Sequence, residues 1–119
     1  MKTMLRVASE RDAINVVNDQ IGSPTHAIDL AEAIVAVIES GSKNYGIYHF
    51  SNEGVASWYD FAKEIFSLNG VAIQLNPIPT SAYPTPAKRP PYSVLDKSKF
   101  KTEFKFAIPD WQDSLKAYK

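Results

Sequence analysis

The chain has 119 residues, 45% hydrophobic and 22% charged, which is the balance of an ordinary soluble protein with one core. Lysine plus arginine equal aspartate plus glutamate at 13 each, so the net charge is zero and nucleic-acid binding has little electrostatic support. The absence of cysteine excludes disulfides, thiolate metal sites and a cysteine nucleophile. Because the sequence has neither a membrane-spanning apolar run nor a signal peptide, we expect a cytoplasmic protein.

The first third of the chain is predicted to form a helix, a strand and a second helix. Residues 2–12 form the first helix, and residues 14–18 form a strand rich in β-branched residues. The second helix runs to about Glu39, with Thr25 as its N-cap and Gly41 as its stop. Its apolar residues recur at helical spacing: Ala27, Leu30, Ala31, Ile34, Val35 and Ile38.

A second strand is predicted at residues 46–51. Apolar or aromatic side chains occupy successive positions there, which is the pattern of a strand covered on both faces, as in a parallel sheet. The other strands predicted in the chain are too few to supply its neighbours. We therefore expect something else to cover this strand.

A third helix and a third strand follow. Ser57 and Asp60 form a capping-box-like start, and Asn69 and Gly70 end the helix. The residues expected to face inward are Trp58, Phe61, Ala62, Ile65 and Phe66. Residues 71–79 are predicted to form a strand, with alternating Val71, Ile73 and Leu75.

Six of the eight prolines lie between Pro77 and Pro91. Such a segment cannot be a helix or a central strand, because proline lacks the N–H donor. It is either a disordered linker or a packed surface loop. Tyr83 and Tyr92 favour the packed loop, since linkers are poor in aromatic residues.

Two short helices are predicted to end the chain. Asp96 caps the first and Asp110 caps the second. The residues expected to face inward are Phe100 and Phe104 in the first and Trp111, Leu115 and Tyr118 in the second. Strands that alternate with helices indicate an α/β fold. We therefore predict one unit over residues 1–119, with about three short strands, four to five helices and a proline-rich loop.

Residues 19–25 are the first candidate binding site. They lie between a predicted strand and a predicted helix, and α/β folds bind ligands at the carboxyl ends of strands, near helix N-termini. Gln20 can donate and accept hydrogen bonds, which suits a base or a sugar. The same residues also fit a well-capped turn that binds nothing.

Lys88 and Arg89, in the proline-rich loop, are the second candidate. Arginine binds phosphate in a bidentate manner, and a rigid loop would aim it at a pyrophosphate. The alternative is a solvated basic pair without a ligand.

No catalytic, metal or cofactor site is predicted. Tyr59 and Lys63 have the Tyr-x-x-x-Lys spacing of short-chain dehydrogenases, but this composition gives about half such a pair by chance. His26, at a helix start, is placed to touch a ligand and His49 is expected to be packed, and neither fits a metal-ligand spacing or a triad. The glycines at 22, 41, 46, 54 and 70 cannot form the G-x-G-x-x-G turn of a dinucleotide site.

Five motifs together resemble the C-terminal part of the dTDP-4-dehydrorhamnose reductase family. They are VNDQIGSPT at 17–25, GIYHFSN at 46–52, SWYDFA at 57–62, PTSAYPTPAKRP at 79–90 and PDW at 109–111. Their order and approximate spacing agree over essentially the whole chain. The combination of the first and the fourth motif is specific.

The resemblance implies the substrate-binding portion of an extended short-chain dehydrogenase with a Rossmann-like fold. The complete enzyme reduces dTDP-4-dehydro-6-deoxy-L-mannose to dTDP-L-rhamnose with NADPH or NADH. Its N-terminal dinucleotide-binding domain, which holds the catalytic tyrosine and lysine, is expected to be absent here, so this chain is expected to bind no cofactor and to be inactive alone. By analogy, Gln20 and Thr25 would hydrogen-bond to the dTDP-sugar and Arg89 would face its diphosphate.

The resemblance also predicts partners. In the family, the strand that matches residues 46–51 belongs to the Rossmann sheet, so we expect self-association or pairing with a separate Rossmann-domain chain. No nucleic-acid or membrane partner is expected. The alternative function is a stand-alone nucleotide-sugar-binding or protein-interaction module.

Overall fold

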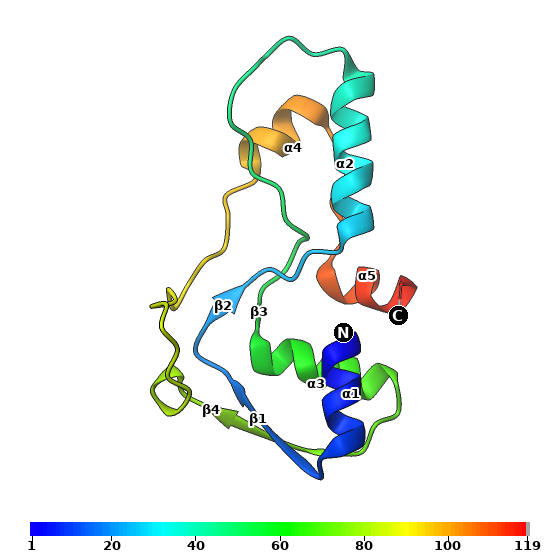
Figure 1. Cartoon of the computed structure of the whole chain (residues 1–119). Helices are drawn as coiled ribbons and strands as arrows, with labels where there is room; N and C mark the ends of the chain where they lie inside the picture. Colours follow the sequence, from blue (N-terminus) through cyan, green and yellow to red (C-terminus); the bar gives the residue numbers. More distant parts are fainter. Residues whose placement is uncertain (119) are drawn as a thin grey trace.

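The computed structural model describes residues 1–118, which form an elongated α/β arrangement of five α-helices and four short strands (Figure 1). One end holds the strands β1 (Ala13–Val17) and β4 (Gln74–Ile78) with the helices α1 (Lys2–Glu10) and α3 (Trp58–Leu68). The other end holds α2 (Ala27–Ser40) and α4 (Ser98–Phe104), and α5 (Trp111–Ala117) lies between the two ends. Across residues 1–118, no helix has both the length and the hydropathy that a membrane span requires.

β1 and β4 form a parallel two-stranded sheet that supports the main core. Ile14 and Val16 of β1 are buried against α3, together with Ile65 and Phe66 of that helix. These side chains are apolar and alternate along the strand, so their burial follows from the strand period. The strand predicted at 14–18 is confirmed within a residue, and the strand predicted at 71–79 is confirmed but begins only at Gln74.

A second, antiparallel pair joins β2 (Ile21–Gly22) to β3 (Ala56–Ser57). Two residues are too few to show alternation, so the sequence did not predict these strands. The pairing brings the segment around Gln20 beside the start of α3. On its other side β2 holds the end of the proline-rich loop, since Ile21 N–H donates to Pro91 O at 2.8 Å.

The prediction of a strand at residues 46–51 is wrong. The segment is extended, but it pairs with no strand among residues 1–118. Ile47 is 80% exposed, and His49 is exposed rather than packed. Only part of the segment is held, because the rings of Tyr48 and Phe50 contact Phe104 and Phe100 of α4. A strand covered on both faces needs neighbouring strands, and the described residues supply none.

Helix α2 turns most of its apolar residues to solvent. Its buried residues are Asp29 and Ala33, whereas the exposed apolar ones are Ile28, Leu30, Ile34, Val35 and Ile38. Helical spacing predicted the helix correctly, but it cannot say what covers the apolar face. Thr25 is not the N-cap as predicted; His26 is, and its Nδ1 accepts the Ile28 N–H at 3.2 Å. Gly41 ends the helix in the left-handed conformation, as predicted.

Most of the later caps are as predicted. Ser57 and Asp60 form the capping box of α3, and the Asp110 carboxylate accepts a backbone N–H of α5. Lys97 rather than Asp96 occupies the N-cap position of α4. The Asp96 carboxylate still accepts the N–H of the first residue of that helix at 2.9 Å, so the predicted contact exists one position away from the predicted cap.

The proline-rich loop is exposed, which contradicts the prediction of a packed loop. Every residue from 81 to 93 is exposed, including Tyr83 at 61% and Tyr92 at 63%. The loop is nevertheless attached at both ends. It starts at the short 3-10 helix η1 (Thr80–Ala82), which bonds to Asp19, and it ends on β2.

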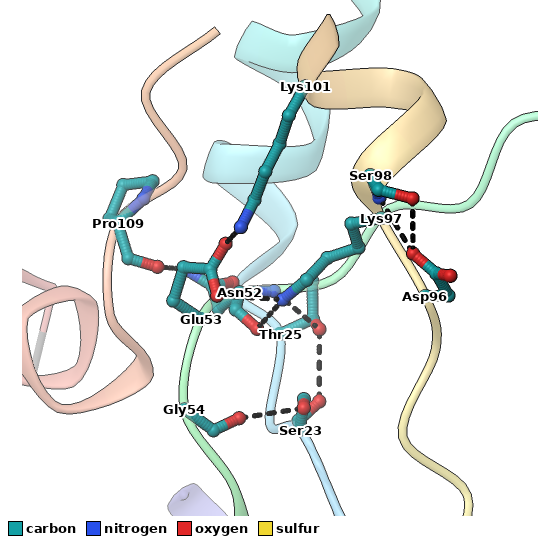
Figure 2. A network of polar contacts seen from close by, with 10 residues as sticks. All are labelled: Ser23, Thr25, Asn52, Glu53, Gly54, Asp96, Lys97, Ser98, Lys101 and Pro109. Atoms are coloured by element: carbon teal, nitrogen blue, oxygen red, sulfur yellow. Dashed lines mark hydrogen bonds and ion pairs between the residues drawn. The ribbon is translucent and has the colours of Figure 1, made fainter.

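A polar network joins residues 23–25 and 52–54 to the start of α4 (Figure 2). Asn52 is fully buried at its centre, and Lys97 Nζ donates to Asn52 O at 2.8 Å. The same Lys97 nitrogen lies 3.4 Å from Glu53 Oε2. Lys101 also pairs with this carboxylate, and its hydrogen bond, assisted by the charge of Lys97, holds the pKa of Glu53 below its ordinary value. These contacts hold Asn52 and Glu53 against Lys97 and α4.

The molecule exposes more surface than a self-contained domain of its mass. Its exposed area is 7959 Å² at 13.2 kDa, whereas a compact monomer of that mass exposes about 6,400 Å². Its radius of gyration is 16.7 Å, against about 13.5 Å for a compact domain of this length. The apolar face of α2 and the neighbouring Tyr45 and Ile47 contribute to that surplus.

Candidate functional site

A pocket of about 540 Å³ lies where β2, β3, the start of α3 and the proline-rich loop meet. This volume lies within the range of small-molecule sites. The three residues predicted to bind substrate, Gln20, Thr25 and Arg89, all line it, although Arg89 is more than sixty residues away from the other two in sequence. The other lining residues are Ile21, Gly22, Ser23, Pro24, Ala56, Ser57, Trp58, Phe61, Pro90 and Ser93.

Arg89 is the only charged residue among those that line the pocket. Its side chain is exposed, and within residues 1–118 it has no hydrogen bond or ion pair. A guanidinium without a carboxylate partner keeps all five N–H donors for a ligand. The pocket can therefore offer a fork of donors to a phosphate or a diphosphate.

Gln20 is held by hydrogen bonds on both sides of its amide. Its Oε1 accepts the Trp58 Nε1–H at 3.3 Å, and its Nε2 donates to Thr80 Oγ1 at 3.1 Å. Thr80 in turn donates its hydroxyl proton to Asp19 Oδ1 at 2.5 Å and its backbone N–H to both Asp19 oxygens. Both bonds lower the pKa of Asp19, and the bond from the Thr80 hydroxyl has the larger effect, because they stabilise the charged carboxylate.

Thr25 uses its hydroxyl mainly within the protein. The hydroxyl donates to Ser23 O at 3.1 Å and accepts the Asn52 N–H at 3.3 Å, as Figure 2 shows. Ser23 Oγ donates to Gly54 O at 2.7 Å. These contacts tie the wall of the pocket to residues 52–54. These bonds leave one lone pair of the Thr25 hydroxyl oxygen for a ligand. The role of Thr25 in binding a substrate stays a prediction.

Sequence reasoning missed Trp58, which it had assigned to the core. The indole is 52% exposed and lines the pocket. Trp58 is the first residue of α3, so its side chain leaves the helix before the face that packs on β1 begins. A position directly after a predicted N-cap was the signal that could have indicated this. Tyr118 was also expected inward, but it is 39% exposed and stacks on the His26 ring with centroids 4.3 Å apart.

The remaining candidates do not form a second site with the first. Tyr59 packs against the core, whereas Lys63 is exposed, and no hydrogen bond joins them within the described chain. His26 caps α2 and stacks on Tyr118, and His49 lies on the surface of the other end. Among residues 1–118, no three histidine or carboxylate side chains gather where they could hold a metal ion.

Comparison with known proteins assigns the chain to a family. Residues 1–119 match the RmlD substrate binding domain over their whole length. The chain belongs to the RmlD substrate-binding domain family. It is 44% identical over 127 residues to a dTDP-4-dehydrorhamnose reductase of Aggregatibacter actinomycetemcomitans, covering 98% of this chain and 43% of that protein. The resemblance predicted from the five motifs is therefore confirmed.

Solved structures agree with this assignment. A dTDP-4-dehydrorhamnose reductase of Clostridium acetobutylicum matches with a TM-score of 0.92 and 43% identity, over 98% of this chain and 41% of that one. A reductase of Bacillus anthracis strain Ames, solved in complex with NADP, matches with a TM-score of 0.91 and 38% identity, over 98% of this chain and 41% of that one. The predicted α/β class is confirmed by these folds. The RmlD substrate-binding domain described here spans about two fifths of the length of these relatives.

Proposed function

We propose that this chain binds the dTDP part of a dTDP-linked deoxysugar and forms the substrate side of a cytoplasmic dTDP-4-dehydrorhamnose reductase. The observation that carries the proposal is the pocket beside β2, where an unpaired arginine faces an otherwise uncharged site in a member of a substrate-binding family. Arg89 would bind the diphosphate through charge-assisted hydrogen bonds, and the second N–H of Gln20 Nε2 would reach the base or the sugar.

The described residues do not fit the nicotinamide cofactor that such a reduction uses. A dinucleotide site needs a glycine-rich turn between a strand and a helix, where the helix N-terminus meets the pyrophosphate. None of Gly41, Gly46 and Gly70 opens a helix, Gly22 lies within β2, and Gly54 lies two residues before β3. We propose that NADPH or NADH binds to a dinucleotide-binding domain other than the described part of this chain.

The apolar face of α2 supports a second role in association. Five apolar side chains of α2, and Ile47 of the unpaired segment at 46–51, are exposed on a chain whose exposed area exceeds that of a compact monomer by about 1,500 Å². That excess is of the order of one side of a large protein interface. We propose that the sheet of a dinucleotide-binding domain covers this face, in the same or in a separate chain.

The association can be measured on the chain by itself. Because the face is apolar and uncovered, the chain is expected to self-associate as its concentration rises, and light scattering measures its mass. Ile34→Glu with Ile38→Glu should shift it toward the monomer, whereas the matched double change Val55→Glu with Leu95→Glu, at exposed residues outside this face, should not. A monomer at every concentration would contradict the role of the face in association.

Calorimetric titration with dTDP tests the proposed binding function. The RmlD substrate-binding domain is expected to bind dTDP at one saturable site, more weakly as salt rises, because a cation contacts a diphosphate. A mixture with NADPH and the 4-keto sugar should not oxidise NADPH. Absence of saturable dTDP binding would contradict the proposal.

A further inference from the structure

The hydrogen bonds that link Asp19 to Trp58 through Thr80 and Gln20 allow only one assignment of donors and acceptors. The Asp19 carboxylate accepts the only proton of the Thr80 hydroxyl, so Thr80 Oγ1 is left to accept from Gln20. At the far side, the indole nitrogen of Trp58 can only donate, so it must face the amide oxygen of Gln20. The charge of Asp19 therefore fixes the orientation of the Gln20 amide, and through it the partner of the indole.

Trp58 is the largest flat surface at the pocket. Its ring is half-exposed, and one edge is fixed by the hydrogen bond to Gln20 while Arg89 lines the same pocket. In a nucleoside diphosphate a flat base lies on one side of the phosphates. Aromatic side chains bind such bases by stacking, and they do so best when the ring is already held in place.

We propose that Asp19, acting through Thr80 and Gln20, is a positioning residue that holds the Trp58 indole as the stacking surface for the base of the nucleotide-sugar. This inference rests on the proposed function and adds two points to it. It assigns the base to the Trp58 side of the pocket, and it gives Gln20 a positioning role.

The first test follows the indole N–H of Trp58 by NMR without any ligand. Asp19→Asn places an amide NH₂ against the Thr80 N–H, because both carboxylate oxygens lie within 3.0 Å of that nitrogen. The contacts then break, so the indole N–H signal should move and exchange faster with water. Thr80→Val should do the same. Asp12→Asn removes the same charge directly before the first residue of β1, at the end of the strand away from Asp19, and should leave the signal in place.

The second test compares dTDP with inorganic pyrophosphate, which lacks a base. Trp58→Ala should weaken dTDP binding about tenfold, which corresponds to about 1.4 kcal/mol, and leave pyrophosphate binding unchanged. Trp58→Phe should recover most of the loss, because phenylalanine also stacks. Asp19→Asn should weaken dTDP binding about threefold, again without an effect on pyrophosphate.

The outcomes separate the two proposals. If the unmodified chain binds dTDP and Trp58→Ala binds it equally well, the stacking role is wrong while the proposed function stands. An indole N–H signal that is unmoved by Asp19→Asn and Thr80→Val overturns the positioning role, whether or not a ligand binds. If the unmodified chain binds neither dTDP nor pyrophosphate, the proposed function fails and the stacking role fails with it.

Discussion

Replacing Asn52 with alanine is expected to lower the free energy of unfolding by about 3 kcal/mol or more. The side chain is fully buried, and its Nδ2 donates to Asp29 Oδ2 at 2.6 Å and lies 3.0 Å from Ser114 Oγ and 3.1 Å from Pro109 O. Its Oδ1 accepts the backbone N–H of His26 at 2.9 Å. Alanine fills none of these positions, so the buried Asp29 carboxyl and the part-buried His26 N–H each lose a partner.

Urea unfolding followed by circular dichroism measures this loss. Asn18→Ala is the matched control, because Asn18 is exposed and its side chain makes no hydrogen bond within residues 1–118. The control is expected to stay within about 0.5 kcal/mol of the original protein. Equal stability of the two variants would mean that residues 51–54 are not held by the side chain of Asn52.

Arg89→Ala is expected to weaken dTDP binding by about ten- to a hundredfold. Among residues 1–118, Arg89 is the only charged residue that lines the pocket, so its removal takes away the donors that a diphosphate needs. Because the side chain is exposed and unpaired within the described chain, the stability of the protein should change little. A loss of affinity without a loss of stability would separate a binding role from a structural one.

Lys88→Ala is the control for this experiment. Lys88 carries the same charge one residue away, but it does not line the pocket. If binding depends only on the overall charge of the loop, both variants should weaken dTDP equally. If it depends on the fork of donors that Arg89 presents, Lys88→Ala should remain close to the original protein. Equal effects would argue against a specific diphosphate contact.

Local sequence signals predicted most of the helices and the first and last strands. The capping box at Ser57 and Asp60 and the glycine stop at Gly41 are properties of one turn of chain, so the sequence alone determines them. The strands β2 and β3 were missed because two residues carry no periodicity. Their pairing depends on residues 21–22 and 56–57 meeting in space, which no local pattern encodes.

Burial was harder to predict than structure type. The apolar spacing of α2 and the pattern of residues 46–51 indicate surfaces that need a cover, and the described chain does not supply one. A sequence pattern records what a segment is suited to pack against, even when that neighbour lies elsewhere. For this reason 46–51 was predicted as a buried strand and is found as an extended segment that is exposed at Ile47 and His49.

The candidate site was predicted only in part. Residues 19–25 and Arg89 were singled out for their chemistry, and the fold places residues 20–25 and Arg89 around one pocket. The contribution of Trp58 could not be seen, because whether a tryptophan at a helix start points into a core or into a pocket depends on the neighbouring β2–β3 pair. The same holds for the contacts from Asp19 through Thr80, which join residues 61 positions apart.

The most direct test of the substrate-binding role is to map dTDP onto the chain by NMR chemical shifts. The account predicts that dTDP moves the signals of Ser57, Trp58, Arg89 and Ser93 together, with one common saturation curve, because these residues line one pocket. Signals of α4, such as Thr102, should stay in place. Saturable shifts confined to α2 and α4, or none at the pocket, would contradict the account.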